Sequence, residues 1–447
     1  MGRGALSGKI RHKIAALILT AMMSAMTGCL SAADSLLSAP MLSEEQELIY
    51  TALTEAAGED ISLVYPKDGA YRTAVVFADL DGDELEEAAV FYERKDSPEG
   101  TVRINILDRE QSGESYLWRS VYDHAGAGGS VEEVFFTNLG GSGRVRMAVG
   151  YGLISPMEKA LRVYSYSDGA LDTEYSGTYY KMVRMDLDRD GGEDIVEVGC
   201  NNENHRAYVS LITDRGEGAV NSGTVELSDA TADLPAVQGG FIGTDTPAVF
   251  IDGLLGSGSL ATEIVYCVGG QLRNPAGVSG SDITSLTTRS QRIYCRDADG
   301  DGIIEIPSRE PFPGYRDYGE AQYITNWNIF ENYTIVKKFS SLTEQSAGYV
   351  FMIPGRWEGQ VTVKNDSLTG EKVFLKYNAS LSESRLELMR IMAVSPAREE
   401  ELTAQGYFRA AGNDTAVYMV KLGDTDDNLL LTTSEVINNL LLLEASK

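Results

Sequence analysis

Short apolar runs separated by acidic and glycine-rich loops form the main pattern of residues 61–343. Within many runs apolar and polar positions alternate, which is typical of strands that bury one face. Residues 102–106 show this alternation, with valine or isoleucine at every second position. The pattern therefore predicts a mainly β region built from many short strands.

A single helix is predicted before this β region. Residues 43–46 resemble a capping box, and an apolar stripe follows them at helical spacing until Gly58. Residues 29–60 are therefore expected to form a short tether and one amphipathic helix.

The pattern changes again after residue 343. Strands alternate there with two predicted helices, one over residues 395–406 and a last one over residues 432–443. Residues 344–447 are therefore expected to form an α+β domain. Its entry, an aromatic residue and a proline shortly before Trp357, weakly resembles PsbP/Mog1-like domains.

The first residues have the pattern of a targeting segment. Four basic residues precede an apolar run, residues 14–26, that is too short to span a bilayer. The run leads into Thr-Gly-Cys29, which resembles a bacterial lipobox with Met26 in the usual leucine position. The resemblance implies a lipoprotein signal peptide over residues 1–28 and lipidation of Cys29. The protein would then be anchored at the extracytoplasmic face of the cell membrane. An ordinary signal peptide and an uncleaved anchor remain alternatives.

The composition is strongly acidic. The chain has 66 acidic and 38 basic residues, a formal net charge of −28. Residues 1–28 carry four of the basic residues and no acidic one, so the chain without them has a charge near −32. This charge argues against nucleic acid or an anionic membrane surface as a partner. Three further thiols, Cys200, Cys267 and Cys295, allow at most one disulfide, and the simpler prediction is three buried thiols.

Three acidic loops recur along the β region. Counting from the first aspartate of each loop, acids occupy positions 1, 3, 5 and 9. The loops contain Asp79, Asp81, Asp83 and Glu87; Asp186, Asp188, Asp190 and Asp194; and Asp297, Asp299, Asp301 and Glu305. Oxygens at alternating residues of a tight turn converge at the distance that Ca²⁺ requires. The spacing therefore predicts three calcium sites.

The sixth position distinguishes the first loop from the other two. Gly191 and Gly302 occupy this position in the second and third loops, where glycine lets the backbone turn back sharply. In the first loop Glu84 takes the place of the glycine. Because a side chain there resists the turn, we expect the first site to be the weakest.

Two degenerate copies extend the repeat. Residues 136–149 align without a gap on residues 77–90, with the acidic ligands lost, and residues 240–250 resemble a shortened copy. The five loops begin near residues 79, 138, 186, 243 and 297. This spacing of roughly 50–60 residues leaves room for four strands per repeat, as in the blades of a β-propeller. Residues 61–343 are therefore expected to form a propeller of five blades, or more if the longer gaps contain another.

The loops and their flanking strands resemble the FG-GAP or VCBS repeats of integrin-type β-propellers. In those repeats an Asp-x-Asp-x-Asp-Gly-x-x-Asp loop joins two strands of a blade and holds calcium. For this chain the resemblance implies a structural Ca²⁺ in each loop, bound by the twelve carboxylates named above. The layout of anchor, helix and propeller is also similar to clostridial surface lipoproteins, a resemblance that implies no particular function.

An EF-hand is the alternative for the second loop, because Glu197 stands at its position 12. The context favours a loop between strands. Position 8 is Glu193, where an EF-hand has an apolar residue, and the flanking residues have strand patterns. Position 12 is Val90 in the first loop and Ser308 in the third.

No catalytic motif emerges from the sequence. The three histidines have no metal-ligand or triad spacing nearby, and HExxH, GxSxG and a complete phosphate-binding loop are missing. We therefore expect a non-enzymatic, calcium-binding surface protein that binds another envelope or extracellular molecule, either protein or glycan. An enzyme acting on extracellular polysaccharide is one alternative, since paired carboxylates could serve it. An envelope-assembly accessory protein is the other.

Overall fold

The computed structural model describes residues 44–443, apart from 96–100, 113–114, 156, 202–205, 229–232 and 317–320. The predicted signal peptide and the lipidation site at Cys29 lie outside the described residues. In the described part of the chain, no helix is both long and apolar enough to cross a membrane.

The described chain is mainly β and begins with one helix that covers the first sheet. Helix α3 (Glu44–Ala57) buries Ile49, Ala52 and Leu53 against the strands, as expected from an apolar stripe at helical spacing. Strands β1 and β2 both pair with β3, and β4 and β5 follow in order. The strands are β1 (Ile61–Leu63), β2 (Val75–Ala78), β3 (Glu87–Arg94), β4 (Arg103–Ser112) and β5 (Ser115–Ala125).

Three four-stranded antiparallel sheets follow, each with its strands in chain order. The second sheet consists of β6 (Ser130–Thr137), β7 (Arg146–Gly152), β8 (Lys159–Ser167) and β9 (Ala170–Tyr179). The third consists of β10 (Lys181–Met185), β11 (Asp194–Cys200), β12 (Ala207–Asp214) and β13 (Ala219–Glu226). The fourth consists of β14 (Ala236–Ile242), β15 (Thr246–Leu254), β16 (Leu260–Val268) and β17 (Gln271–Arg273).

A connecting segment with η1 (Pro275–Gly277) and α4 (Ile283–Thr287) leads to the fifth sheet. This sheet begins as a similar meander and then recruits two strands from the C-terminal region. Its strands are β18 (Ile306–Pro311), β19 (Tyr323–Glu331), β20 (Thr334–Glu344), β21 (Tyr349–Met352) and β27 (Leu440–Leu442).

The sixth sheet belongs to the C-terminal α+β unit. Its order is β22-β23-β24-β26-β25, and a large apolar cluster joins it to the fifth sheet. Trp357 is buried in that cluster. The strands are β22 (Val361–Asn365), β23 (Lys372–Lys376), β24 (Glu387–Val394), β25 (Phe408–Gly412) and β26 (Val417–Leu422). The helical segments are η2 (Gly355–Trp357), η3 (Pro396–Arg398), α5 (Glu399–Ala404) and α6 (Thr433–Asn439).

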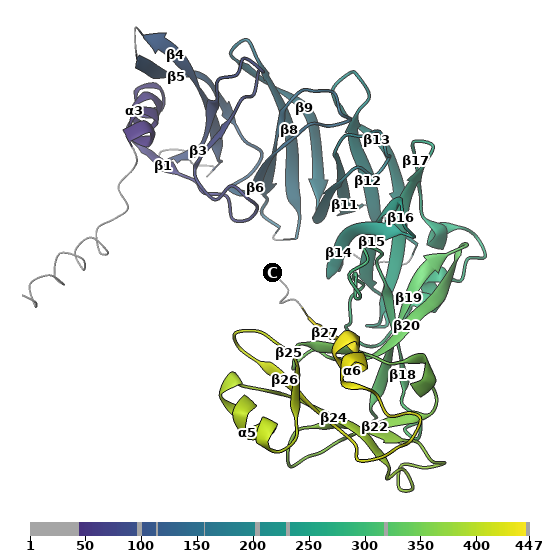
Figure 1. Ribbon diagram of the computed structural model, residues 1–447. Helices are drawn as coiled ribbons and strands as arrows, with labels where there is room; N and C mark the ends of the chain where they lie inside the picture. Colours follow the sequence, from purple (N-terminus) through teal and green to yellow (C-terminus); the bar gives the residue numbers. More distant parts are fainter. Residues whose placement is uncertain are drawn as a thin grey trace, which may run out of the picture.

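The five repeat sheets follow one another along a crescent (Figure 1). Apolar clusters join the first sheet to the second, the second to the third, the third to the fourth and the fourth to the fifth. Among the described residues, no such cluster joins the first sheet to the fifth. The fold is therefore a mainly β array of antiparallel sheets, and a closed ring is not seen.

Two expectations for the C-terminal region need correction or refinement. The last helix ends at Asn439 rather than continuing to residue 443, because Leu440–Leu442 pairs with β21 as a strand. The expected domain boundary after residue 343 falls inside the fifth sheet, since β20 pairs with β21. The capping box at Thr432 is present as expected.

Candidate metal centres

The three acidic loops lie in three different sheets. In each sheet the loop joins the first strand of the repeat to the second. Loop 79–87 joins the antiparallel strands β2 and β3, and loop 186–194 joins β10 and β11. In loop 297–305 the first strand is reduced to Arg296, which forms an isolated antiparallel bridge with Glu305. The degenerate loops join β6 to β7 and β14 to β15. The repeat seen in the sequence is thus one structural unit used five times.

One hydrogen bond recurs in all three acidic loops. The backbone N–H at position 2 donates to the carboxylate at position 9 and so closes the loop. The bonds are Leu80 to Glu87 at 2.7 Å, Leu187 to Asp194 at 2.9 Å, and Ala298 to Glu305 at 2.7 Å. The position 9 carboxylates are almost completely buried, at 0–1% exposed. The shared bond thus fixes one oxygen of each position 9 carboxylate.

The structure brings ten of the twelve expected carboxylates together. In each group, one oxygen per residue lies within 4.8 Å of the others. Ca²⁺ binds oxygens at 2.3–2.6 Å, so two ligands of one ion can lie about 5 Å apart. The groups are Asp79, Asp81 and Glu87; Asp186, Asp188 and Asp194; and Asp297, Asp299, Asp301 and Glu305.

The position 5 residue accepts a turn-shaping hydrogen bond in all three loops, and only Asp301 also joins a converging group. Oδ1 of Asp83 accepts the Leu85 N–H, and Oδ1 of Asp190 accepts the Gly192 N–H, both at 2.8 Å. These bonds shape the turn, and neither carboxylate joins the converging group of its loop.

Buried oxygens without a partner mark the first two loops. Oε1 of Glu87, Oδ1 of Asp194 and Oδ1 of Asp186 accept no hydrogen bond from any described residue. Burial raises the pKa of Glu87 to about 7, and the carboxylates of Asp81 and Asp108 add to the effect. Burial likewise raises the pKa of Asp194 to about 6, although the neighbouring Thr213 hydroxyl acts in the opposite direction. In each carboxylate one oxygen is bonded and the other accepts nothing, and a desolvated charge with an unsatisfied oxygen is unfavourable, so both loops suit a bound cation.

In the third loop a lysine contacts the same carboxylates. Nζ of Lys338, on β20, lies 2.7 Å from Oε1 of Glu305, 2.7 Å from Oδ2 of Asp301 and 2.9 Å from Oδ2 of Asp299. Burial alone would lower the pKa of Lys338, but these carboxylates raise it above its ordinary value. Both oxygens of Glu305 therefore have partners, unlike those of Glu87 and Asp194.

Two backbone positions in each acidic loop are left-handed. Glu84 adopts the turn that position 6 requires, with φ of 72°, so its side chain does not prevent the loop from closing. In the second loop Arg189, at position 4, has φ of 66°. In the third loop glycine stands at both positions, Gly300 and Gly302. The first two loops thus each contain one residue in a conformation that side chains disfavour.

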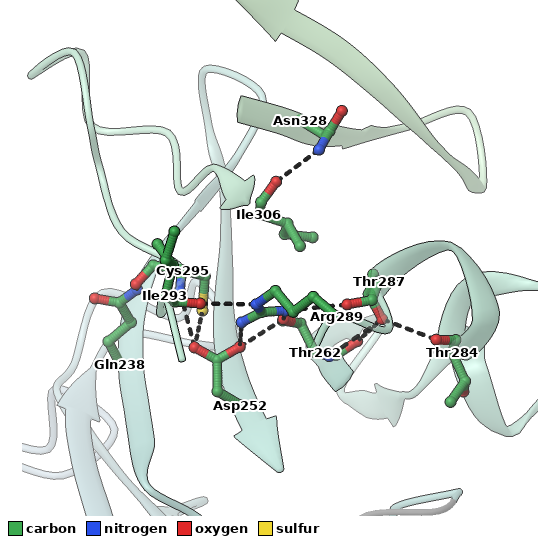
Figure 2. Close-up of polar contacts among 10 residues, drawn as sticks. All are labelled: Gln238, Asp252, Thr262, Thr284, Thr287, Arg289, Ile293, Cys295, Ile306 and Asn328. Carbon is green, nitrogen blue, oxygen red and sulfur yellow. Dashed lines mark hydrogen bonds and ion pairs between the residues drawn. The ribbon is translucent and has the colours of Figure 1, made fainter. Parts of the chain in front are cut away.

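A second polar cluster connects the fourth sheet with the segment before the fifth (Figure 2). Nη2 of Arg289 lies 2.5 Å from Oδ1 of Asp252, and the Cys295 amide donates to Oδ2 at 2.8 Å. Burial raises the pKa of the Cys295 thiol well above its ordinary value, and Asp252 adds to this. The thiol is thus a poor nucleophile. The contacts of Asp252 with Arg289 and Cys295 join the fourth sheet to the following segment, so the cluster has a structural role, and we call it the Asp252 clip. Cys200, Cys267 and Cys295 are all free thiols, as expected, but only Cys200 and Cys295 are buried and Cys267 is partly exposed.

A polar pocket lies between the second and third sheets. Glu197 on β11 is 1% exposed and accepts the Tyr175 hydroxyl hydrogen bond at 2.7 Å, while its Oε1 accepts none from the described chain. Burial raises the pKa of Glu197 to about 7. The lining also includes Gly177, Thr178, Asn201, Tyr208, Ser210, Asn221, Thr224 and Glu226.

Comparison with known proteins leaves the family open. No protein-family model and no curated protein matches the chain. Among solved structures, an exotype rhamnogalacturonan lyase aligns at 12% identity and a TM-score of 0.25, over 71% of this chain and 62% of the lyase. A β-1,3-galactosidase aligns at the same identity and TM-score, over 62% of this chain and 96% of its own. The chain thus spans less than two thirds of the lyase, and likenesses this low carry no inference about activity.

The sequence did not indicate which basic side chains contact the loops. Lys338 lies 33 residues beyond Glu305 and belongs to no motif. Arg146 gave a usable signal, because the gap-free alignment of residues 136–149 places it at position 9, where the other loops have an acid.

Proposed function

We propose that this chain is a calcium-binding surface protein whose repeat sheets are propeller-type blades of the FG-GAP kind. The observation that carries the proposal is the convergence of three carboxylates around a buried, unpartnered oxygen in loops 79–87 and 186–194. A cation that enters such a loop offsets both the desolvation and the mutual repulsion of the acids. An all-oxygen ligand set in a flexible turn suits Ca²⁺ better than Zn²⁺ or Cu²⁺.

Calcium in these loops would be structural, and the binding of an extracellular partner would be the role of the array. Adjacent repeats support one another at their loops. Leu139 of the second sheet forms a parallel bridge with Glu193 of the third, and Phe241 of the fourth with Ile303 of the fifth. Calcium that holds an acidic loop in place would therefore also hold the degenerate loop bridged to it. This side of the array would stay rigid for a protein or glycan ligand.

Calcium titration by isothermal calorimetry tests the proposal. The full-length chain should bind Ca²⁺, and Asp81→Asn and Asp188→Asn should each remove one site, because each replaces a converging carboxylate by a neutral amide. The control Asp168→Asn makes the same change in an exposed hairpin turn outside the three groups and should bind as the parent does. Absence of binding by the parent at millimolar Ca²⁺ would refute the proposal.

The proposed location at the cell surface has its own test. Cys29→Ala should abolish lipidation, so the protein should appear in the medium or remain as an uncleaved precursor. Detergent partitioning and the mass of the processed chain would show this. A parallel Cys200→Ala variant should partition like the parent. Unchanged processing and partitioning of Cys29→Ala would rule out the anchor.

The pocket at Glu197 supports an extracellular polysaccharide-acting enzyme as a second candidate. A carboxyl group with a pKa near 7 beside tyrosine side chains is suited to general acid catalysis. If this candidate holds, the chain should release reducing ends from a cell-wall or plant polysaccharide, and Glu197→Gln should lose that activity at least a hundredfold. A glycan array that shows binding without turnover would favour the binding protein instead.

A further inference from the structure

A β-bulge occurs at the same place in four of the five repeat sheets. In each, one residue on the fourth strand of the repeat is left without a partner in the ladder. The unpaired residues are Val121, Glu174, Ser222 and Lys338. The fourth sheet has no such shift between its last two strands, and it also has the shortened loop. The bulge and the full-length loop therefore occur together.

The ladder shows that the four bulges are equivalent. In each sheet, the residue after position 9 on the second strand pairs with a residue of the third strand. That residue in turn pairs with a residue of the fourth strand, and the next residue of the fourth strand is the unpaired one. The paths are Ala88–Leu107–Ser120 to Val121, Met147–Tyr164–Thr173 to Glu174, Ile195–Ile212–Asn221 to Ser222, and Ile306–Asn328–Lys337 to Lys338. A β-bulge changes the direction of the side chain of its unpaired residue. The unpaired residue can therefore be redirected in the same way in all four sheets.

Where the bulge residue is charged, it pairs with position 9. In the fifth sheet Lys338 on the bulge contacts Glu305 at position 9 at 2.7 Å. In the second sheet the charges are exchanged: Nε of Arg146 at position 9 lies 2.6 Å from Oε2 of Glu174 on the bulge. Arg146 is completely buried and also contacts Asp214 of the third sheet at 2.5 Å. Both loops are thus closed by an ion pair made within the chain.

Where the bulge residue is neutral, position 9 keeps an unpartnered oxygen. Val121 packs in the apolar cluster of the first two sheets, and the hydroxyl of Ser222 donates to the Leu211 carbonyl at 3.4 Å. Oε1 of Glu87 and Oδ1 of Asp194, in the same two sheets, accept no hydrogen bond from the described chain. Neither loop receives a cation from its bulge; in the second loop the half-exposed Arg215 lies 4.0 Å from Oδ2 of Asp188.

We infer that the bulge residue decides whether a loop takes its cation from solvent, and that the Lys338 ammonium replaces Ca²⁺ in the loop at 297–305. The chain then binds two calcium ions, at 79–87 and 186–194, rather than the three that the acidic motifs suggest. The number of ions given by this inference rests on the proposed function, that is, on calcium binding by the acidic loops. The ammonium holds the place because removing it would leave Glu305 buried and charged without a counter-charge, with only the Ala298 N–H as its hydrogen-bond donor.

Calorimetric Ca²⁺ titration of four full-length proteins tests the inference. The parent should bind two ions per chain. Lys338→Met removes the ammonium at similar size and should raise the number to three. Ser222→Lys places an ammonium on the equivalent bulge of the third sheet and should lower the number to one without deleting any buried partner. Lys337→Met, which alters the exposed neighbour paired with Glu358, should leave it at two.

The outcomes separate the two proposals. Absence of calcium binding by the parent refutes the proposed function. Three ions bound by the parent, or two by Lys338→Met, leaves calcium binding intact and overturns the inference about the bulge. If Lys338→Met folds only with calcium present, its bound ions are counted by equilibrium dialysis in Ca²⁺ instead of by titration of the calcium-free protein. The Ser222→Lys result does not depend on that step, and an unchanged number of two in that variant also counts against the inference.

Discussion

At the scale of single residues, backbone strain occurs in the same two loops for which we propose calcium binding. Glu84 and Arg189 hold left-handed conformations that cost about 1–2 kcal/mol for residues with a side chain. The loop closed by Lys338 has glycine at both equivalent positions and carries no such cost. Strain of this kind persists when the surrounding contacts over-determine it, and a bound ion would supply such contacts.

The first prediction concerns Glu84. Glu84→Gly should raise the free energy of unfolding in EDTA by about 1 kcal/mol, because glycine adopts φ of 72° without strain. It should also tighten calcium binding at loop 79–87, which the sequence indicates as the weakest site. Urea denaturation and calorimetry measure the two effects. Glu86→Gly, in the same loop without a left-handed backbone, is the control and should not stabilise the fold. Equal effects of the two substitutions would show that strain is not the cause.

The second prediction concerns the buried carboxyl of Glu197. Burial raises its pKa from an ordinary value of 4.5 to about 7, so the folded state keeps a proton that the unfolded state loses between these values. Its contribution to stability is therefore present below about pH 4.5 and is lost as the pH rises through 7. Glu197→Gln removes the ionisation and still accepts from Tyr175. It should stabilise the fold at pH 8 by up to ~3 kcal/mol.

The pH dependence of that gain is the critical measurement. The difference in unfolding free energy between Glu197→Gln and the parent should shrink as the pH falls from 8 towards 5. Glu331→Gln, an exposed change in the β19–β20 hairpin, should show no difference at either pH. A gain that is the same at both pH values would mean that ionisation of Glu197 is not its source.

At the scale of elements, the acidic loops were predictable and the bulges were not. Positions 1 to 9 of each loop are contiguous in sequence, so their spacing alone indicated converging carboxylates. The pairing of Arg146 with Glu174 depends on a register shift 28 residues away. No local pattern of apolar and polar residues encodes which residue a bulge will leave unpaired, because the shift is set by packing across the sheet. The helical pattern over Leu440–Leu442 is overridden for a similar reason, since pairing with β21 makes this segment a strand.

The third prediction concerns the Asp252 clip between the fourth sheet and the segment before the fifth. Asp252→Asn should lower the free energy of unfolding by about 3–5 kcal/mol, because it leaves the buried Arg289 guanidinium without a counter-charge. The double variant Asp252→Leu, Arg289→Met should recover much of that loss, since it removes both charges. Chemical denaturation would measure both. The control Arg398→Ala breaks an exposed pair with Glu401 and should cost under about 1 kcal/mol.

At the scale of the whole molecule, the repeats form an open array with covered ends. Helix α3 covers the first sheet, and the C-terminal unit packs against the fifth (Figure 1). Linear arrays need such terminal elements because the outermost repeat has no neighbour on one side. The period of the loops indicated five repeats, and five repeat sheets are present. Closure into a ring depends on the angles between successive sheets, which are set by side-chain packing at each junction and leave no repeating signal in the sequence.

The last prediction is that calcium stabilises this array locally. Extracellular calcium modules bind at roughly 10⁻⁴–10⁻³ M, so a tenfold excess over Kd adds about 1.4 kcal/mol per site, or about 3 kcal/mol for two sites. That is a large share of a typical stability of about 5–15 kcal/mol, and EDTA should therefore lower the melting temperature. Because each sheet contacts mainly its neighbours, the loosening should appear as faster hydrogen exchange in the β2–β3 and β10–β11 hairpins. The loop at 297–305 serves as the internal control, since Lys338 should keep it protected in EDTA. A melting curve indifferent to EDTA, or equal loss of protection in all three loops, would contradict this picture of two metal-filled loops and one closed by the chain itself.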